Sequence, residues 1–396
     1  MKRILLVCYG GGHANIIKSI YPVLTEKVEA EIIILALTAA PKIFIANNIP
    51  FNTLSQLVCD LECYDEIVRL GTQFGAPLHN DNMGIELEDT IAYYGCGMYD
   101  LIHRFGEDEA CKMFSENGRK AFLPVSIMEM ILNKLKPDVV VITVSPRMEK
   151  AAGIAAEKLS IPVVRINDIP VTTMIEHQCT LCVMNEWAKK YAIHNAGYPE
   201  ESVIVTGQPV FEEELYLNKD EMNSVKDYLA LDQFNRMVLF LTRNGKDETP
   251  VINKIYEIAQ KMPDTLFVIK LHPNQEITSF KKPELTNVRI ENGAAMYYIA
   301  LCNLAITTVS TTGLEAALMD KPLIEINIEH ETYSLNYDEM GIAVLVDNLN
   351  ALEKHIMELL DKQSAEYCNL AESRKLFMNQ PNARENICSV IEKLLY

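Results

Sequence analysis

The chain has 396 residues, of which 49% are hydrophobic and 23% are charged, a composition typical of a folded protein with two or three domains. It carries 36 Lys and Arg residues against 54 Asp and Glu residues, so its formal net charge is −18. This balance excludes non-specific nucleic-acid binding, which needs a basic surface, and electrostatic docking on an anionic membrane.

The apolar runs and the cysteines indicate where the protein resides. No uncharged apolar run approaches the length of about 18 residues that a transmembrane segment needs. The first apolar run, Ile4–Tyr9, is too short for a signal peptide. The ten cysteines form no dense framework, so we expect reduced thiols and a cytoplasmic protein. A homodimer is compatible with the sequence.

The first 37 residues predict a βαβ unit. Ile4–Tyr9 is an apolar strand that ends at three glycines, Ala14–Val23 is a helix, and Glu31–Leu37 is a second apolar strand. Strands that are apolar throughout are typical of a parallel sheet covered on both faces.

Residues 51–135 differ from this pattern. Clusters of Gly, Asp, Asn and Tyr at 74–84 and 93–97 alternate with acidic helical stretches such as Gly106–Gly118. We interpret this region as a mostly helical insertion in the first domain.

The alternation of strands and helices then resumes in two series. The expected strands are 137–143, 161–166, 180–184 and 203–206 in the first series, and 237–242, 265–271, 304–308, 322–328 and 343–346 in the second. The expected helices are 148–159, 186–196, 249–261, 295–302 and 313–319, with a polar stretch at 218–232 and a helical tail at 350–396.

The predicted fold class is therefore α/β, with two Rossmann-like domains that face each other across a cleft. We expect the first domain at 1–207, the second at 208–370, and a C-terminal helix at 371–396 that can pack back on the first domain. Ligands of open α/β sheets bind beyond the carboxyl ends of the strands, so the residues that follow each strand are the candidate site.

Gly10, Gly11, Gly12 and His13 follow the first strand. Glycines allow a ligand to approach the backbone, and a helix N-terminus attracts anions. The dinucleotide fingerprint is not met, because Asn15 stands where its last glycine is required. The helix dipole should favour the neutral, basic form of His13, which makes it a candidate general base. A turn needed only for packing is the alternative.

Two motifs in the second half predict a phosphate site. His272 ends a strand just before Pro273. About 38 residues later, the hydroxyls of Thr308, Ser310, Thr311 and Thr312 precede a helix, which is typical of a phosphate cradle. Their alternatives are an ordinary strand end and an ordinary helix N-cap.

Arg243 ends the first strand of the second series, where its charge would neutralise a diphosphate; a solvated turn is the alternative.

Cys179 and Cys182 lie on an expected strand, where positions i and i+3 point to opposite faces, and no second ligand pair accompanies them. We therefore predict no metal site and no cofactor.

Taken together, these motifs resemble the GT-B superfamily. The segments that carry the resemblance are the glycine turn with His13, Val205–Val210, Leu271–Asn274 and Ser310–Ala316. Within GT-B, they are most similar to the hydrolysing UDP-N-acetylglucosamine 2-epimerase-like group and to bacterial glycosyltransferases with paired HP and S/T motifs. The glycine turn is similar to the acceptor-side loop of MurG-type transferases, whereas residues 51–135 match no known pattern.

The resemblance implies a nucleotide-sugar donor in the second domain and a glycan or small-molecule acceptor in the first. The donor site would comprise Arg243, His272, Asn274, Glu291, Asn292, Thr308, Ser310, Thr311, Thr312 and Glu315. Here Glu315, in the first helical turn, would hold the ribose, and Glu291 and Asn292 would border the base. Gly11 and Gly12 would bind the acceptor, with His13 or Asp168 as the catalytic base and no metal required.

Two departures weigh against the epimerase. That group has His-Val-Glu-Ala-Gly-Leu-Arg where this chain has Val164–Pro170, with one acid and no following arginine. Its Ser-Gly-Gly is replaced here by Thr311-Thr312-Gly313. We therefore predict a metal-independent glycosyltransferase of bacterial glycan biosynthesis, with a UDP-sugar favoured as donor. A 2-epimerase and an inactive sugar-nucleotide-binding protein are the alternatives.

Overall fold

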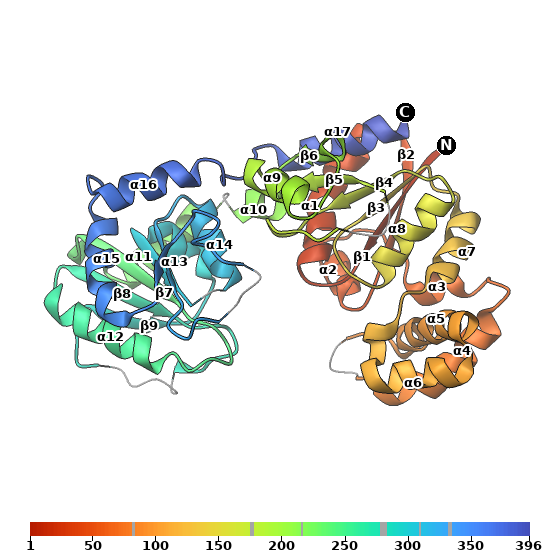
Figure 1. Ribbon diagram of the computed structural model, residues 1–396, viewed down its shortest axis with the longest axis horizontal. Helices are drawn as coiled ribbons and strands as arrows, with labels where there is room; N and C mark the ends of the chain where they lie inside the picture. Colours follow the sequence, from red (N-terminus) through yellow and green to blue (C-terminus); the bar gives the residue numbers. More distant parts are fainter. Residues whose placement is uncertain (81–83, 175–177, 215–216, 278–282, 309, 332–334) are drawn as a thin grey trace. The chain divides into compact units, whose positions relative to one another are not determined.

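The computed structural model consists of two compact units (Figure 1). It describes residues 1–80, 84–174, 178–214, 217–277, 283–308, 310–331 and 335–396. The first unit contains Met1–Glu212 and Gln380–Tyr396, and the second contains Glu213–Asn379. From the sequence, the first boundary was expected at residue 207 and the second at residue 370.

The first unit is built on a six-stranded parallel sheet in the order β2-β1-β3-β4-β5-β6. Its strands are β1 (Lys2–Cys8), β2 (Ala30–Ala36), β3 (Val139–Ile142), β4 (Val163–Ile166), β5 (Thr180–Val183) and β6 (Val203–Val205). The central strands are Val-, Ile- and Leu-rich, and side chains on both of their faces are fully buried. This is the pattern that a sheet covered by helices on both faces requires.

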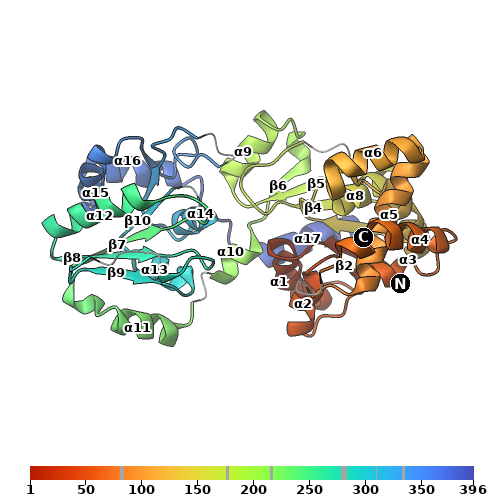
Figure 2. The ribbon, with the colours of Figure 1, turned by 90° about the horizontal axis from the view of Figure 1, so that it is seen from below.

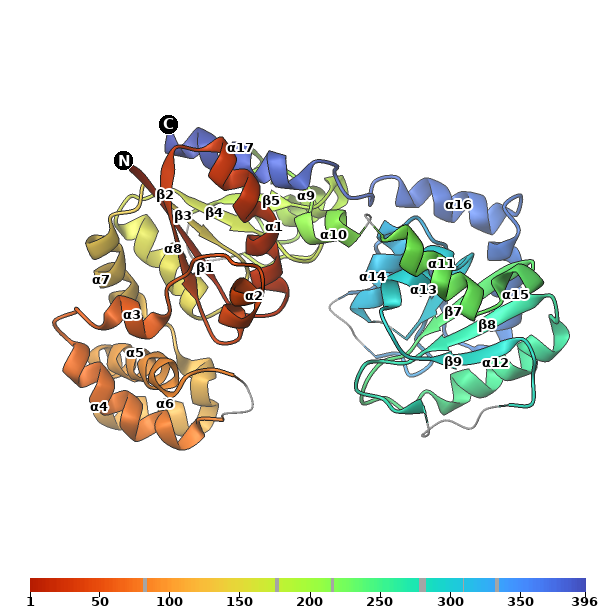
Figure 3. The ribbon, with the colours of Figure 1, turned by 180° about the vertical axis from the view of Figure 1, so that it is seen from behind.

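Helices cover each face of this sheet. One face packs against α1 (Gly12–Lys27), α2 (Ala40–Ala46) and the C-terminal helix α17 (Ala383–Leu395). Helix α17 lies alongside α1, so the end of the chain returns to the first unit (Figure 3). The opposite face packs against α7 (Val125–Leu135) and α8 (Met148–Lys158), and α9 (Glu186–His194) lies near the β5–β6 edge.

Residues 51–135 form the expected helical insertion. It contains α3 (Leu54–Val58), α4 (Tyr64–Phe74), α5 (Leu87–Phe105), α6 (Glu107–Asn117) and the short helices η1 (Ala76–Leu78) and η3 (Gly118–Ala121). Residues 93–97 were expected between helices but lie inside α5. Their glycines serve close packing, because a Cβ on Gly95 would lie 2.1 Å from the Ile67 carbonyl of α4.

The second unit repeats the architecture, with a parallel sheet in the order β12-β11-β10-β7-β8-β9. Its strands are β7 (Arg236–Leu241), β8 (Thr265–Lys270), β9 (Val288–Glu291), β10 (Leu304–Thr307), β11 (Leu323–Ile326) and β12 (Val344–Val346). Helices α12 (Thr249–Lys261) and α15 (Leu352–Leu360) cover one face; α11 (Lys219–Tyr228) and α13 (Ala295–Leu301) lie on the other (Figure 2). Helices α10 (Pro209–Glu214), α14 (Thr311–Leu318) and α16 (Ala365–Arg374) complete the chain.

Three features of this part of the chain were not expected from the sequence. The polar stretch at 218–232 contains helix α11, whose N-cap is the side chain of Asn218. Strand β9 was not expected, because Val288–Glu291 is too short a run to stand out. Residues 371–396 are not one helix, since α16 ends at Arg374 and α17 begins at Ala383.

The α/β class and the two Rossmann-like domains are confirmed. Among the described residues, no helix combines the length and the apolar character needed to span a bilayer.

Candidate active site

The glycine turn after β1 leaves open space at the start of α1. A Cβ on Gly10 would lie 2.8 Å from Ala39, so packing alone requires glycine there. A Cβ on Gly11 or Gly12 would meet nothing within 4 Å. Gly11 also has a φ of 71°, which favours glycine. The backbone at Gly11 and Gly12 is therefore open to a ligand, although Gly11 has a conformational reason to be glycine as well.

His13, in the first turn of α1, is held by a buried carboxylate. Its Nδ1 lies 3.0 Å from Oε1 of Glu149, a residue of α8 whose side chain is fully buried. A buried carboxylate needs several donors to offset its lost hydration, and Glu149 has them. The donors are the N–H groups of Tyr9, Thr143 and Ser145 and the hydroxyl of Thr143. The ends of β1 and β3 thus fix Glu149, and Glu149 fixes the imidazole ring.

Asp168, just after β4, faces the other nitrogen of the ring. Its Oδ2 lies 3.7 Å from Nε2 of His13. Burial of the ring opposes its charge, but Asp168 and Glu149 outweigh this effect and raise the pKa of His13 from 6.5 to about 9. The expectation that His13 is neutral is therefore wrong, because the hydrogen bonds and charges of Asp168 and Glu149 favour the protonated ring. His13 is an imidazolium at neutral pH.

This arrangement has a defined chemical capacity. Since Nδ1 is committed to Glu149, the proton that His13 can exchange is the one on Nε2. With that proton, the ring is an acid or an electrostatic partner of an anion; without it, the ring is a strong base. Sequence reasoning missed Glu149, because an acid in the first turn of a helix is ordinary and only the fold reveals its buried partners.

The second unit contains a separate cavity of about 560 Å³ at the carboxyl ends of β7, β8 and β10. Five of the expected donor residues line it, namely Arg243, His272, Ser310, Thr311 and Thr312. The motif that contains His272 and the motif that contains Ser310–Thr312 therefore line the same cavity.

His272 is fixed with one ring nitrogen occupied. Its backbone N–H donates to Oγ1 of Thr242 and Oε1 of Gln275, both at 2.9 Å. Its Nδ1 accepts a hydrogen bond of 3.1 Å from the backbone N–H of Asn274. A neutral ring that accepts at Nδ1 carries its proton on Nε2, so Nε2 is left as a donor.

Ser310 is the N-cap residue of α14. The N–H of Gly313 donates to the Ser310 carbonyl at 2.8 Å, so the start of the helix offers an anion the N–H groups of Thr311 and Thr312. The buried phenol of Tyr337 donates to the Ser310 carbonyl at 2.5 Å and fixes this turn. A Cβ on Gly313 would lie 2.8 Å from Thr307 and Tyr337, so only glycine allows this packing. Val309 lies outside the described residues.

Lys270 is a cavity residue that sequence reasoning missed. It is the last residue of β8, is 4% exposed, and lines the cavity. Its Nζ donates to the Leu271 carbonyl at 2.6 Å, and burial lowers its pKa. Within the described ranges it forms no ion pair with a carboxylate, so its charge is available to an anionic ligand. A lysine at the end of an apolar run, two residues before His272-Pro273, was the available signal.

The remaining expected donor residues do not line this cavity. Thr308 is buried and its hydroxyl donates to Glu248, so it has another role. Glu315 lies beyond the first turn of α14, which contains no acidic residue. Asn274, Glu291 and Asn292 lie near the cavity in sequence but are not part of its lining. Arg243 lines the cavity while pairing with Glu331 at 3.6 Å.

Comparisons with known proteins find similarity in structure only. No family model and no curated protein sequence matches the chain. S. aureus MnaA, solved with UDP, aligns with a TM-score of 0.60 at 14% identity over 100% of this chain and 97% of its own. Neisseria meningitidis UDP-GlcNAc 2-epimerase, bound to UDP-GlcNAc, aligns with a TM-score of 0.59 at 16% identity over 99% of both chains. Acinetobacter baumannii MurG aligns with a TM-score of 0.55 at 15% identity over 99% of this chain and 100% of its own. The chain shares the GT-B fold of these proteins.

Proposed function

We propose that the protein is a metal-independent glycosyltransferase that uses a nucleotide-activated sugar, with a UDP-sugar as the favoured donor. The observation that carries the proposal is the orientation of His13 by the buried Glu149, which leaves Nε2 as its reactive atom. A nucleophile activated by an oriented histidine is what transfer to an acceptor hydroxyl requires.

The donor diphosphate would bind in the cavity of the second unit. Lys270 would supply charge, His272 a donor at Nε2, and Ser310–Thr312 their hydroxyl and N–H groups. Together these groups balance a departing diphosphate without a metal ion. Two of the structurally similar proteins were solved with UDP or UDP-GlcNAc, which supports UDP as the nucleotide. Glu315 would contact the ribose, and Glu291 and Asn292 the base.

The acceptor would bind at the glycine turn of the first unit. Its hydroxyl oxygen would form a bond to the anomeric carbon while the bond from that carbon to the diphosphate oxygen breaks. The hydroxyl proton would pass to Nε2 of His13, and Asp168 is the alternative base. Because the pKa of His13 is about 9, only its minor neutral form accepts this proton at pH 7.

A hydrolysing 2-epimerase is the second candidate, and one observation favours it. His13 carries a proton at neutral pH and lies between the carboxylates of Glu149 and Asp168. A proton donor, His13, and a proton acceptor, Asp168, are therefore adjacent in this site. Moving a proton at C2 of the sugar while expelling UDP needs such a pair.

One experiment separates the candidates. The protein is incubated with UDP-GlcNAc alone, and then with each member of a panel of UDP-, CDP- and GDP-sugars plus acceptors. A transferase releases the nucleotide efficiently only when an acceptor is present. UDP and N-acetylmannosamine formed from UDP-GlcNAc without any acceptor would identify the epimerase and overturn the transferase proposal.

A third outcome is tight nucleotide binding with no turnover in any combination, which would identify an inactive sugar-nucleotide-binding protein. Thermal shifts detect the binding: a ligand at about 100 times its Kd stabilises the folded state by roughly 2.7 kcal/mol.

A further inference from the structure

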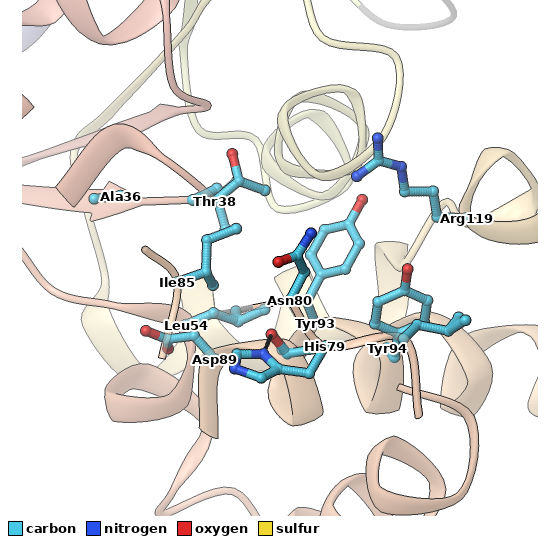
Figure 4. A pocket seen from close by; sticks show the side chains of 13 residues that line it. Ala36, Thr38, Leu54, His79, Asn80, Ile85, Asp89, Tyr93, Tyr94 and Arg119 are labelled. Carbon is cyan, nitrogen blue, oxygen red and sulfur yellow. Dashed lines mark hydrogen bonds between the residues drawn. The ribbon is translucent and has the colours of Figure 1, made fainter. Parts of the chain in front are cut away.

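A second cavity lies in the first unit, between the carboxyl end of β2 and the helical insertion (Figure 4). Its volume is about 90 Å³. Much of its wall is apolar, formed by Leu37 after β2, Leu54 of α3, Leu78 of η1 and Ile85 before α5. Thr38, His79, Asn80, Asp89 and Thr90 add polar groups to the same wall.

The opposite part of the wall is aromatic and positively charged. Tyr93 and Tyr94 of α5 line the cavity together with Arg119 of η3. In the view of Figure 4, the guanidinium of Arg119 lies on the same side as the hydroxyl of Tyr93, away from Asp89 and His79. Arg147 adds a second charge behind this wall, since its guanidinium lies 5.3 Å from the centre of the Tyr9 ring.

Arg119, which lines the cavity, and Arg147 behind it bring two positive charges to this wall, and the lining also contains the carboxylate of Asp89. Both arginines act electrostatically on the hydroxyl of Tyr94, so both lie close to the same wall. Within the described part of the chain, neither guanidinium forms an ion pair with a carboxylate. An arginine at the edge of an apolar cavity is suited to a carboxylate or phosphate group.

The size of the cavity limits what it holds. A cavity of about 150 Å³ binds benzene, so 90 Å³ accommodates part of a ring or a short branched chain, while the rest of the ligand extends out of it. The cavity therefore fits one apolar portion of a larger ligand.

This cavity is joined to the His13 site by direct contacts. The hydroxyl of Tyr9 donates to the hydroxyl of Tyr93 at 3.2 Å. The backbone N–H of Tyr9 donates to Glu149, which holds His13. Tyr93, Tyr9 and Glu149 thus connect the cavity to the proposed catalytic histidine.

We propose that this cavity binds part of the apolar ring of a small-molecule acceptor that carries an acidic group, and that Arg119 binds that group. The acceptor class is then an aromatic or alicyclic acid with a hydroxyl group. This inference rests on the proposed transferase function, because it assigns the acceptor of that enzyme.

The test measures binding of benzoate, with no donor present, by saturation-transfer NMR. Benzyl alcohol, which lacks the charge, and acetate, which lacks the ring, are the matched probes. Two variants alter the cavity: Arg119→Gln removes the charge, and Ile85→Trp fills the space from a partly exposed position. Two controls make the same changes outside it, at exposed positions of the same insertion: Arg69→Gln on α4 and Leu87→Trp on α5.

We expect wild type to bind benzoate more tightly than benzyl alcohol or acetate. Arg119→Gln should weaken benzoate binding by about tenfold or more, since one charge-assisted contact is lost. Ile85→Trp should abolish it, and both controls should retain it. Equal binding by all four variants, or no benzoate binding by folded wild-type protein, would overturn the proposal.

UDP binding, measured on the same samples, keeps the two proposals separate. If UDP binds and benzoate does not, the acceptor assignment fails and the donor assignment stands. If benzoate binds as expected and no nucleotide binds, the transferase function fails while the acid-binding cavity stands.

Discussion

Glu149 has no exposed side-chain surface, yet its carboxylate lies 3.0 Å from the half-buried imidazole of His13. This carboxylate also accepts hydrogen bonds from three backbone N–H groups and one hydroxyl. A group so fully satisfied is poorly placed to react, so its role is to fix the orientation of His13 and to support its charge.

The charge of His13 links the stability of the protein to pH. Its pKa is about 9 in the folded state and about 6.5 in the unfolded chain, so its stabilising effect is complete below pH 6.5 and is lost as the pH rises through 9. We therefore expect wild type to lose stability relative to His13→Gln between pH 6.5 and 9. Urea unfolding at several pH values measures this difference, and a constant difference across the range would contradict the assignment.

His13→Ala should reduce turnover by about 10²–10⁴-fold, which is the usual contribution of a general base. The affinity for UDP should be nearly unchanged, because the expected nucleotide site is in the other unit. In wild type, kcat should rise with pH towards about 9 as His13 loses its proton. Normal turnover by the variant would pass the role of base to Asp168.

Lys270→Met and His272→Ala should each weaken the binding of a nucleoside diphosphate by about 1.5–3 kcal/mol, the usual range for a hydrogen bond to a charged group. Methionine keeps most of the volume of Lys270 and removes its charge and its hydrogen bond to the Leu271 carbonyl. Lys261→Met, at an exposed position of α12, is the matched control and should bind like wild type. Calorimetric titration with UDP measures all four proteins, and wild-type affinity in both variants would exclude this cavity.

Activity should survive EDTA. Lys270 and the N-terminus of α14 supply positive charge, and Nε2 of His272 supplies a hydrogen-bond donor, in place of a metal ion. Assays with and without the chelator, followed by addition of Mg²⁺, provide the measurement. Loss of turnover with EDTA and its recovery with Mg²⁺ would show that these groups are insufficient.

The sheets could be predicted from the sequence because their strands are short apolar runs bounded by Gly, Pro and polar residues. The sequence also predicted that His272 and Ser310–Thr312 lie close together, since both motifs follow strands of one parallel sheet.

The features that could not be predicted depend on residues distant in sequence. The protonation of His13 is set by Glu149 and Asp168, which are far along the chain, and the hydroxyl of Thr308 points to Glu248 rather than to the cavity. Residues 93–97 lie inside α5 although glycine disfavours a helix, because Gly95 packs closely against Ile67 of α4 and Gly97 against Phe122.

The most direct test of the donor site is a crystal structure of the protein with UDP bound in the absence of divalent metal. We predict that the diphosphate oxygens lie within hydrogen-bonding distance of Nε2 of His272 and of the hydroxyl or N–H groups of Ser310–Thr312, with Nζ of Lys270 nearby. A diphosphate bound away from His272 and Ser310–Thr312 would contradict the account.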